Sequence, residues 1–393
     1  MRAICVAVLF LCGIASGVAE DPEVTADFSG IVQHWGYPVE EHDVTTADGY
    51  ILTVHRIPYG KNGPSKGANR PVVFLMHGLE GSSASWVLNL PNESAGFMFA
   101  DAGFDCWFGN FRGNVYSKRH VQLDPNSHDF WKFSWDQMAS KDLPAMIQKV
   151  LDITGQDQIY YVGDSMGTLT AFAEFSQNQQ LATHIKEYFA LGPVASVTHI
   201  KGLFRFLADN YHLIDWLLNV FGVDQFLPPD WFTHTVAEVV CEDHLTAHLC
   251  DNLIFLISGP ESQQLNETRV PVYINHTPAG TSTRTMIHFA QNVKFETFQM
   301  YDFGSASLNR EAYGQDTPPQ YHVENMVVPV HLYWGFNDTL ANPTDVNGYL
   351  VPKIKNLVAS TGLDGFSHID FQWGLKAGKE VYQPVIDEIN KSK

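Results

Sequence analysis

The chain has 393 residues, of which 45% are hydrophobic, 13% aromatic and only 17% charged, so it can bury a sizeable core and still expose apolar surface. Its formal net charge of −19 argues against nucleic acid as a partner. No Pro/Ser/Gly linker, charge block or internal repeat divides the sequence, and we therefore expect one large α/β domain with an insertion rather than two average domains.

The first 19 residues predict a signal peptide. Arg2 precedes an apolar run, 3–14, that is too short to span a bilayer, and residues 17–19 fit a signal-peptidase site. The mature chain is then expected to begin near Glu20. No later segment is apolar and free of charge for long enough to cross a membrane, so we expect a soluble protein of the secretory pathway, either lysosomal or extracellular.

Strands and helices alternate through the first half of the mature chain. Residues 50–57 are a strand candidate, and 71–76 is a continuous apolar run typical of a fully buried strand. The run ends in a His-Gly turn at 77–79, which by itself is most often a plain turn. Residues 103–108 predict the next strand, and the loop after it contains Arg112, whose guanidinium we expect to orient the loop.

A helix and two further strands continue this alternation. Apolar residues on one face predict a helix over 134–154, although Pro144 leaves open whether its first part is a separate turn. Strands are expected at 159–162 and 188–191. Such alternation implies a mostly parallel sheet with helices on both faces.

Between the strand at 159–162 and the helical pattern that follows lies Gly163-Asp164-Ser165-Met166-Gly167. This is a Gly-x-Ser-x-Gly nucleophile elbow in the strand-turn-helix context that it requires. The bare pattern occurs often by chance, but its context favours Ser165 as a nucleophile. With the elbow present, the turn at 77–79 becomes a candidate oxyanion site, to which Leu79 would contribute its backbone N–H.

The pattern changes after residue 195. We interpret 196–320 as a mainly helical cap inserted over the carboxyl edge of the sheet, between core segments 20–195 and 321–393. The many apolar residues of 212–232 are either ordinary core or the lining of an acyl pocket or lid. Cys241 and Cys250 are near enough in sequence to pair in an oxidising compartment, which leaves Cys106 as a buried free thiol.

The sheet pattern returns at 327–334 and is followed by two candidate acids. Enzymes with such an elbow pair the serine with an acidic residue and then a histidine, in that order along the chain. Asn342, Pro343 and Asp345 form a helix-start pattern, which assigns Asp345 to helix capping and leaves Asp338 as the acidic partner. His368 is the only one of the 17 histidines after Asp338, and it follows a predicted strand at 356–360.

Five Asn-x-Ser/Thr sequons are present. Asn92, Asn266 and Asn275 are expected to carry glycans on exposed segments. Asn390 is too close to the carboxyl terminus, and Asn337 is excluded because a glycan beside Asp338 would block the site.

The sequence resembles the acid lipases of the gastric and lysosomal type across nearly the whole mature chain. The motifs that carry the resemblance are residues 34–38 (His-Trp-Gly-Tyr-Pro), 77–79, 109–114 (Gly-Asn-Phe-Arg-Gly-Asn), the elbow, 278–282 (Pro-Ala-Gly-Thr-Ser), 301–305 (Tyr-Asp-Phe-Gly-Ser) and 337–338.

This resemblance implies an α/β-hydrolase core with a helical cap and lid that hydrolyses triacylglycerols or cholesteryl esters, often at acidic pH. By position, the family's triad falls on Ser165, Asp338 and His368, its oxyanion donors on the backbone of Leu79 and Met166, and its cap disulfide on Cys241 and Cys250.

The elbow departs from the family's usual Gly-His-Ser-Gln-Gly at Asp164 and Met166. Met166 still offers its backbone N–H, whereas an acidic Asp164 is expected to change the pH profile or the local hydrogen bonding.

The resulting hypothesis is ester hydrolysis through an acyl-enzyme, without a metal or organic cofactor. The expected partner is a lipid substrate at an oil–water or membrane interface. One alternative is a carboxylesterase or phospholipase on the same scaffold, separable by a preference for dissolved short-chain over emulsified long-chain esters. The other is a non-catalytic lipid-binding protein, against which the intact set of Ser165, Asp338 and His368 argues.

Overall fold

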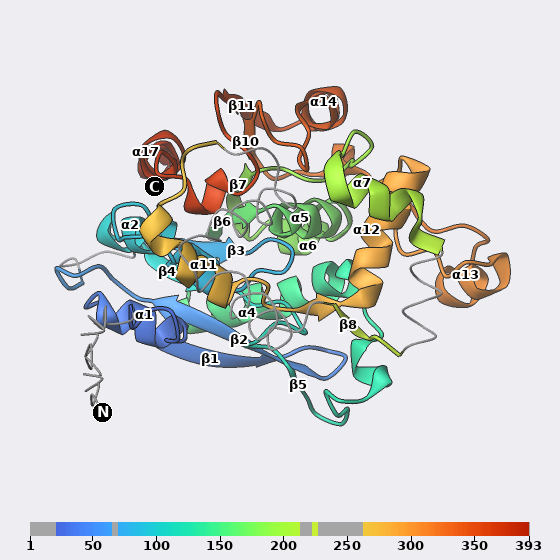
Figure 1. Ribbon diagram of the computed structural model, residues 1–393, viewed down its shortest axis with the longest axis horizontal. Coiled ribbons are helices and arrows are strands. Elements are labelled where there is room, and N and C mark those ends of the chain that lie inside the picture. Colours follow the sequence, from blue (N-terminus) through green and yellow to red (C-terminus); the bar gives the residue numbers. More distant parts are fainter. Residues whose placement is uncertain (1–20, 65–69, 213–221, 227–261, 393) are drawn as a thin grey trace, which may run out of the picture.

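The computed structural model describes residues 21–64, 70–212, 222–226 and 262–392. Its centre is a nine-stranded sheet in the order β1-β2-β4-β3-β6-β7-β10-β11, with β5 paired to β2 (Figure 1). The pairings of β2 with β1, β4 and β5 are antiparallel, and the remaining pairings are parallel. The strands are β1 (Glu40–Thr45), β2 (Tyr50–Ile57), β3 (Val72–Met76), β4 (Asp105–Phe108), β5 (Arg119–His120), β6 (Ile159–Asp164), β7 (Ile185–Leu191), β10 (Val330–Gly335) and β11 (Leu357–Leu363).

Both faces of the central strands are buried, which explains why these strands read as unbroken apolar runs. Because successive side chains of a strand point to opposite faces, Phe74 and Met76 of β3 enter one core cluster while Val73 and Leu75 enter the other. The predicted mostly parallel sheet with two covered faces is confirmed.

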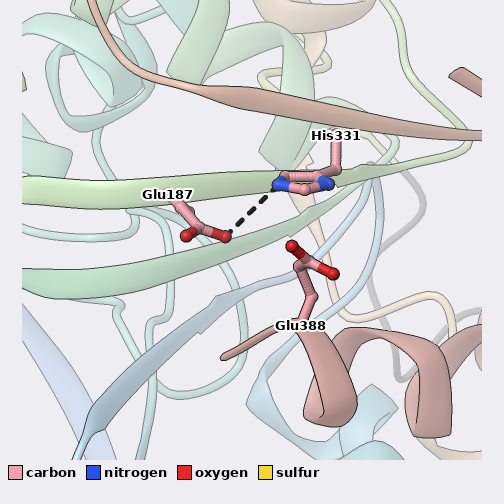
Figure 2. A group of neighbouring side chains, drawn as sticks. All are labelled: Glu187, His331 and Glu388. Atoms are coloured by element: carbon pink, nitrogen blue, oxygen red, sulfur yellow. Dashed lines mark ion pairs between the residues drawn. The ribbon is translucent and has the colours of Figure 1, made fainter. Parts of the chain in front are cut away.

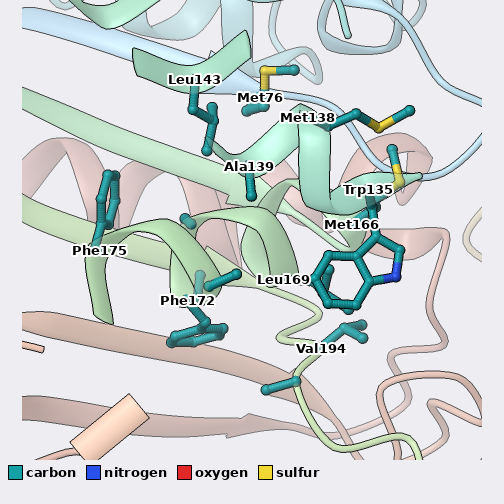
Figure 3. Packing of buried hydrophobic residues seen from close by; sticks show 14 of the residues in the cluster. Met76, Trp135, Met138, Ala139, Leu143, Met166, Leu169, Phe172, Phe175 and Val194 are labelled. Atoms are coloured by element: carbon teal, nitrogen blue, oxygen red, sulfur yellow. The ribbon is translucent and has the colours of Figure 1, made fainter. Parts of the chain in front are cut away.

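Helices cover each face of the sheet. The first cluster includes buried side chains of α4 (Leu143–Thr154) and α5 (Met166–Gln177), and Figure 3 shows Leu169, Phe172 and Phe175 of α5 together with Trp135. The second includes side chains of α1 (Phe28–His34), α2 (Ala95–Asp101) and α17 (Gln383–Ser392). A short helix, α6 (Gln179–Ala182), follows α5.

The helix expected over 134–154 begins at α3 (Trp135–Gln137) and passes through a π-helical turn, Met138–Asp142, before α4. Pro144 has no N–H to donate to the carbonyl four residues earlier, and a wider turn accommodates that loss. The segment is therefore one helical run with an irregular turn rather than two separate elements.

The described parts of 196–320 are mainly helical. They contain α7 (Gly202–Asp209), α11 (Val270–His276), α12 (Thr283–Phe295) and α13 (Ala306–Tyr313), together with a two-stranded pairing of β8 (Gln225–Phe226) and β9 (Thr281–Ser282). Most of 212–232 and both Cys241 and Cys250 lie outside the described residues. Among the residues described, no helix is long and apolar enough to cross a membrane.

Candidate active site

Ser165 occupies a strained turn between β6 and α5. Its φ is +51° and its ψ is −114°, a conformation that is costly for a residue with a Cβ. The turn also needs its two glycines, because a Cβ on Gly167 would lie 2.4 Å from the Met76 carbonyl oxygen and one on Gly163 would lie 2.8 Å from the Gly167 carbonyl oxygen. The Ser165 N–H donates to the Leu191 carbonyl of neighbouring β7 at 3.0 Å, which holds the elbow against the sheet.

Three side chains from three different loops meet at this turn. His368 Nε2 lies 2.7 Å from Ser165 Oγ, and His368 Nδ1 lies 2.8 Å from Asp338 Oδ2. Asp338 follows β10 and His368 follows β11, so parallel strands deliver both residues to the same edge of the sheet as the elbow. The structure thus brings together the three residues named from sequence.

Local contacts fix the orientation of this acid and this imidazole. Asp338 is buried, and its Oδ1 accepts the backbone N–H groups of Leu340 at 2.9 Å and Ala341 at 2.8 Å, leaving Oδ2 for His368. Gly192 has a φ of +53°, and a Cβ there would lie 3.2 Å from His368 Cε1. Sequence reasoning did not identify Gly192, since nothing in the local pattern reveals that an imidazole packs against it.

Charges around the imidazole favour its protonated form. Burial by itself lowers the pKa of His368, but the Asp338 carboxylate, with a smaller contribution from Asp164, raises that pKa above its usual value. This balance suits a group that receives a proton during a reaction and is then stabilised as an imidazolium.

Asp164, which precedes the serine, is an unusual carboxyl. Burial raises its pKa from 3.8 to about 7, a rise that the nearby His368 reduces and Asp338 increases. Its Oδ1 is buried and has no hydrogen-bond partner among the described residues. The departure from the family pattern at this position therefore places a largely neutral carboxyl beside Ser165 at acidic pH.

The turn at 77–79 lies directly against the elbow. A Cβ on Gly78 would come within 3.0 Å of Ser165 Cβ, and the pairing of Met76 with Gly163 places the ends of β3 and β6 side by side. His77 braces the turn: its Nδ1 lies 2.8 Å from the Gly78 carbonyl oxygen, and its Nε2 accepts the N–H of Phe111.

Among the described residues, two backbone N–H groups at this place have no hydrogen-bond acceptor. Met166 is the first residue of α5, so its N–H has no partner within the helix. Within the described part of the chain, the N–H of Leu79 has no hydrogen-bond acceptor either. Both belong to segments that contact Ser165, and a helix amino terminus also favours negative charge.

Glu80 connects this turn to the 278–282 motif of the inserted segment. Its carbonyl oxygen accepts the Ala279 N–H at 2.7 Å, and its Oε2 accepts the Gly280 N–H at 2.9 Å. Glu80 has a φ of +57°, and burial raises the pKa of its carboxyl to about 8. Sequence analysis missed this residue, because its partners lie about 200 positions away.

Asp370 was also missed. It organises the loop that carries His368 by accepting hydrogen bonds from the N–H and hydroxyl of Ser367 and from the hydroxyl of Ser262.

Arg112 and Asp345 both have structural partners. Arg112 is fully buried and binds Asp142 through Nε at 2.8 Å and Asp48 through Nη1 at 2.7 Å, which matches its expected role in orienting the loop. The helix start predicted at 342–345 is confirmed: Asn342 caps the helix, and Asp345 lies in its first turn. The Asp345 carboxylate does not bond back to the cap, however. It accepts the N–H of His199 and lies 2.8 Å from His199 Nδ1, because this helix start packs against residues 196–199.

The structure gives the burial of Cys106 and of the asparagines in the sequons. Cys106 is a buried free thiol. Asn92 is exposed and Asn266 half-buried, while Asn275 donates its side-chain amide to the Val24 carbonyl, a contact that a glycan would have to displace. Asn337 is exposed next to Asp338.

Two family models match the chain. A partial alpha/beta-hydrolase lipase region matches residues 28–90, and the alpha/beta hydrolase fold matches residues 71–374. Among solved structures, epoxide hydrolase VrEH1 from Vigna radiata is similar in fold, with a TM-score of 0.51 at 15% identity over 90% of this chain and 98% of that chain. The fold and the family models define the protein as an α/β-hydrolase.

Curated relatives define the family more closely. Lipase lipl-1 of Caenorhabditis elegans is 49% identical over 97% of this chain and 95% of its own length. Human lysosomal acid lipase/cholesteryl ester hydrolase is 46% identical and human gastric triacylglycerol lipase 44%, each over 95% of this chain and 93% of its own length. The chain belongs to the family of gastric and lysosomal acid lipases, as the sequence motifs predicted.

Proposed function

We propose that the protein is a lipase that hydrolyses the carboxylic esters of neutral lipids, either triacylglycerols or cholesteryl esters. The observation that carries this proposal is the hydrogen-bonded series from Ser165 Oγ through His368 to Asp338, at 2.7 Å and 2.8 Å, in a chain whose relatives are named as lipases of these two lipid classes. Binding alone would require neither the strained serine nor its imidazole.

In this proposal the three residues have the roles of a serine hydrolase triad. His368 Nε2 removes the proton from Ser165 Oγ as that oxygen attacks the ester carbonyl, and Asp338 holds the imidazole in the required tautomer. The imidazolium then protonates the departing alcohol. In the second step His368 activates a water that cleaves the acyl-enzyme and releases the fatty acid.

The tetrahedral intermediates carry a negative charge on the former carbonyl oxygen. We assign its stabilisation to the free N–H groups of Leu79 and Met166, each worth about 3 kcal/mol in comparable sites. A neutral Asp164 favours this charge, whereas an ionised Asp164 opposes it. Protonation of Asp164, whose pKa is about 7, thus supports oxyanion stabilisation at acidic pH, whereas the raised pKa of His368 acts in the opposite direction, because only the neutral imidazole can take the serine proton.

The remaining assignments follow from this function. We propose that residues 1–19 direct the chain into the secretory pathway, for a lysosomal or extracellular destination, and that 196–320 form a cap over the site. Contacts of the inserted segment with Glu80 and Asp345 support that placement. The Cys241–Cys250 disulfide and glycans on Asn92, Asn266 and Asn275 remain proposals as well.

The test is the release of fatty acid from an emulsified long-chain triacylglycerol and from a cholesteryl ester, each at pH 5 and pH 7.5. Ser165→Ala should remove nearly all release, while Ser307→Ala, a change at an exposed serine of α13, should leave it intact. Release by the wild type that survives in Ser165→Ala would assign the chemistry to another nucleophile. Activity only on dissolved short-chain esters would identify a carboxylesterase instead.

A further inference from the structure

A second group of polar side chains lies far from Ser165, near the amino ends of two parallel strands. Glu187 belongs to β7 and His331 to β10, whereas Ser165, Asp338 and His368 follow the carboxyl ends of their strands. The strand register pairs His331 with Phe189, and Glu187 lies two residues before Phe189, so both side chains project from the same face of the sheet. Helix α17, which contributes Glu388, packs on that face.

The three side chains converge on one point. His331 Nε2 lies 3.2 Å from Glu187 Oε2, and one donor atom from each of the three residues lies within 4.8 Å of the other two. Figure 2 shows the carboxylates of Glu187 and Glu388 approaching the imidazole from β7 and from α17. The 3.2 Å separation is close to the roughly 3.4 Å between two ligands of a tetrahedral ion with bonds of about 2.0 to 2.2 Å, and the wider separations, up to 4.8 Å, require the carboxylates to move inwards when an ion binds.

Among the described residues, Nε2 of His331 makes an ion-pair contact with Glu187 but no well-aligned hydrogen bond. His331 is 3% exposed, and neither its Nε2 nor the facing Glu187 Oε2 has a hydrogen-bond partner among the described residues, although the two atoms are close. The ring cannot easily turn elsewhere, because it stacks on Phe189 with a centroid separation of 4.6 Å. A buried nitrogen held in this way beside two carboxylates is suited to donate its lone pair to a cation.

We propose that Glu187, His331 and Glu388 form a binding site for a divalent metal ion of the zinc type. One imidazole nitrogen and two carboxylate oxygens are ligands that zinc accepts, and two negative charges compensate a divalent ion. Water would complete a tetrahedral set from the open side, where the Glu388 side chain is 32% exposed. Glu388 also pairs with Lys391 at 2.9 Å, an exposed contact that a metal ion would outcompete.

Such an ion would fasten α17 to β7 and β10 and would take no part in ester hydrolysis. The alternative is an ion pair between a protonated His331 and Glu187. That pair predicts no affinity for metal ions, which makes the two interpretations separable by direct binding.

The experiment uses the full-length mature protein without a histidine tag, freed of metal with a chelator. Zinc binding is measured by calorimetry at pH 7.5, and thermal unfolding is recorded with zinc and with magnesium. We expect one zinc ion per chain and a rise in Tm with zinc but not with magnesium. Glu388→Gln should weaken zinc binding at least about tenfold and abolish the rise in Tm. Asp387→Asn, an exposed change on the same helix, should do neither.

A second variant, His331→Gln, tests the buried ligand. If His331→Gln does not fold, Glu388→Gln still tests the site. Fatty-acid release by the wild type should not depend on zinc. The proposal is overturned if the wild type binds no zinc at this pH, or if Glu388→Gln binds it as tightly as the wild type does.

Discussion

The buried carboxyl of Asp164 should make the protein less stable as the pH rises. Its pKa in the folded state, about 7, lies about three pH units above the ordinary value of 3.8. Between pH 3.8 and pH 7 the carboxyl is therefore protonated in the folded state and ionised in the unfolded state. At 1.36 kcal/mol per pH unit, the penalty reaches about 4 kcal/mol once both states are ionised. The Asp164 carboxyl therefore does not lower the free energy of unfolding below pH 3.8, and it lowers that free energy by the full amount above pH 7.

Asp164→Asn replaces the group with a neutral one of nearly the same shape and removes this dependence. Asp164 is nearly fully buried, so solvent screens its carboxyl little. Between pH 5 and pH 7.5, the free energy of unfolding of the variant should rise relative to that of the wild type by about 2 to 3 kcal/mol. The measurement is urea denaturation of both proteins at the two pH values.

Asp157→Asn is the matched control, because Asp157 is exposed just before β6. The difference in the free energy of unfolding between Asp157→Asn and the wild type should be the same at both pH values. If the difference between Asp164→Asn and the wild type also stays constant, the carboxyl is already ionised at pH 5, and the link between burial and an acidic working range is refuted.

Three further changes test the fold and the site. Arg112→Leu leaves the buried Asp142 carboxylate without its cation and should lower the free energy of unfolding by about 3 to 5 kcal/mol, as measured by urea denaturation. Gly167→Ala places a Cβ 2.4 Å from the Met76 carbonyl oxygen and should lower both Tm and activity, because the strand and the elbow must separate. Asp338→Asn should keep the fold but reduce kcat by about 10⁴-fold, since an amide favours the wrong tautomer of the imidazole; an unchanged kcat would remove Asp338 from the mechanism.

Much of the fold could be predicted from sequence because its signals are local. The buried runs at β3 and β6 lack alternation, as strands covered on both faces must, and the elbow combines its glycines with a strand and a helix. The required chain order of serine, acid and histidine also limited the candidates, because His368 is the only histidine after Asp338. The helix start at Asn342 was predicted as well, but such a pattern cannot reveal that the Asp345 carboxylate binds a partner such as His199 in another segment.

The amino-acid sequence by itself determined the succession of strands and helices, the elbow and the identity of the three residues that meet there. Tertiary structure decided which strands are neighbours, and thereby placed Ser165 and His368, 203 positions apart, in hydrogen-bond contact. It also decided the ionisation of Asp164 and the grouping of Glu187 with His331. The physical reason is that hydrophobic periodicity acts over a few residues, whereas desolvation and charge depend on segments that only the packed sheet brings together.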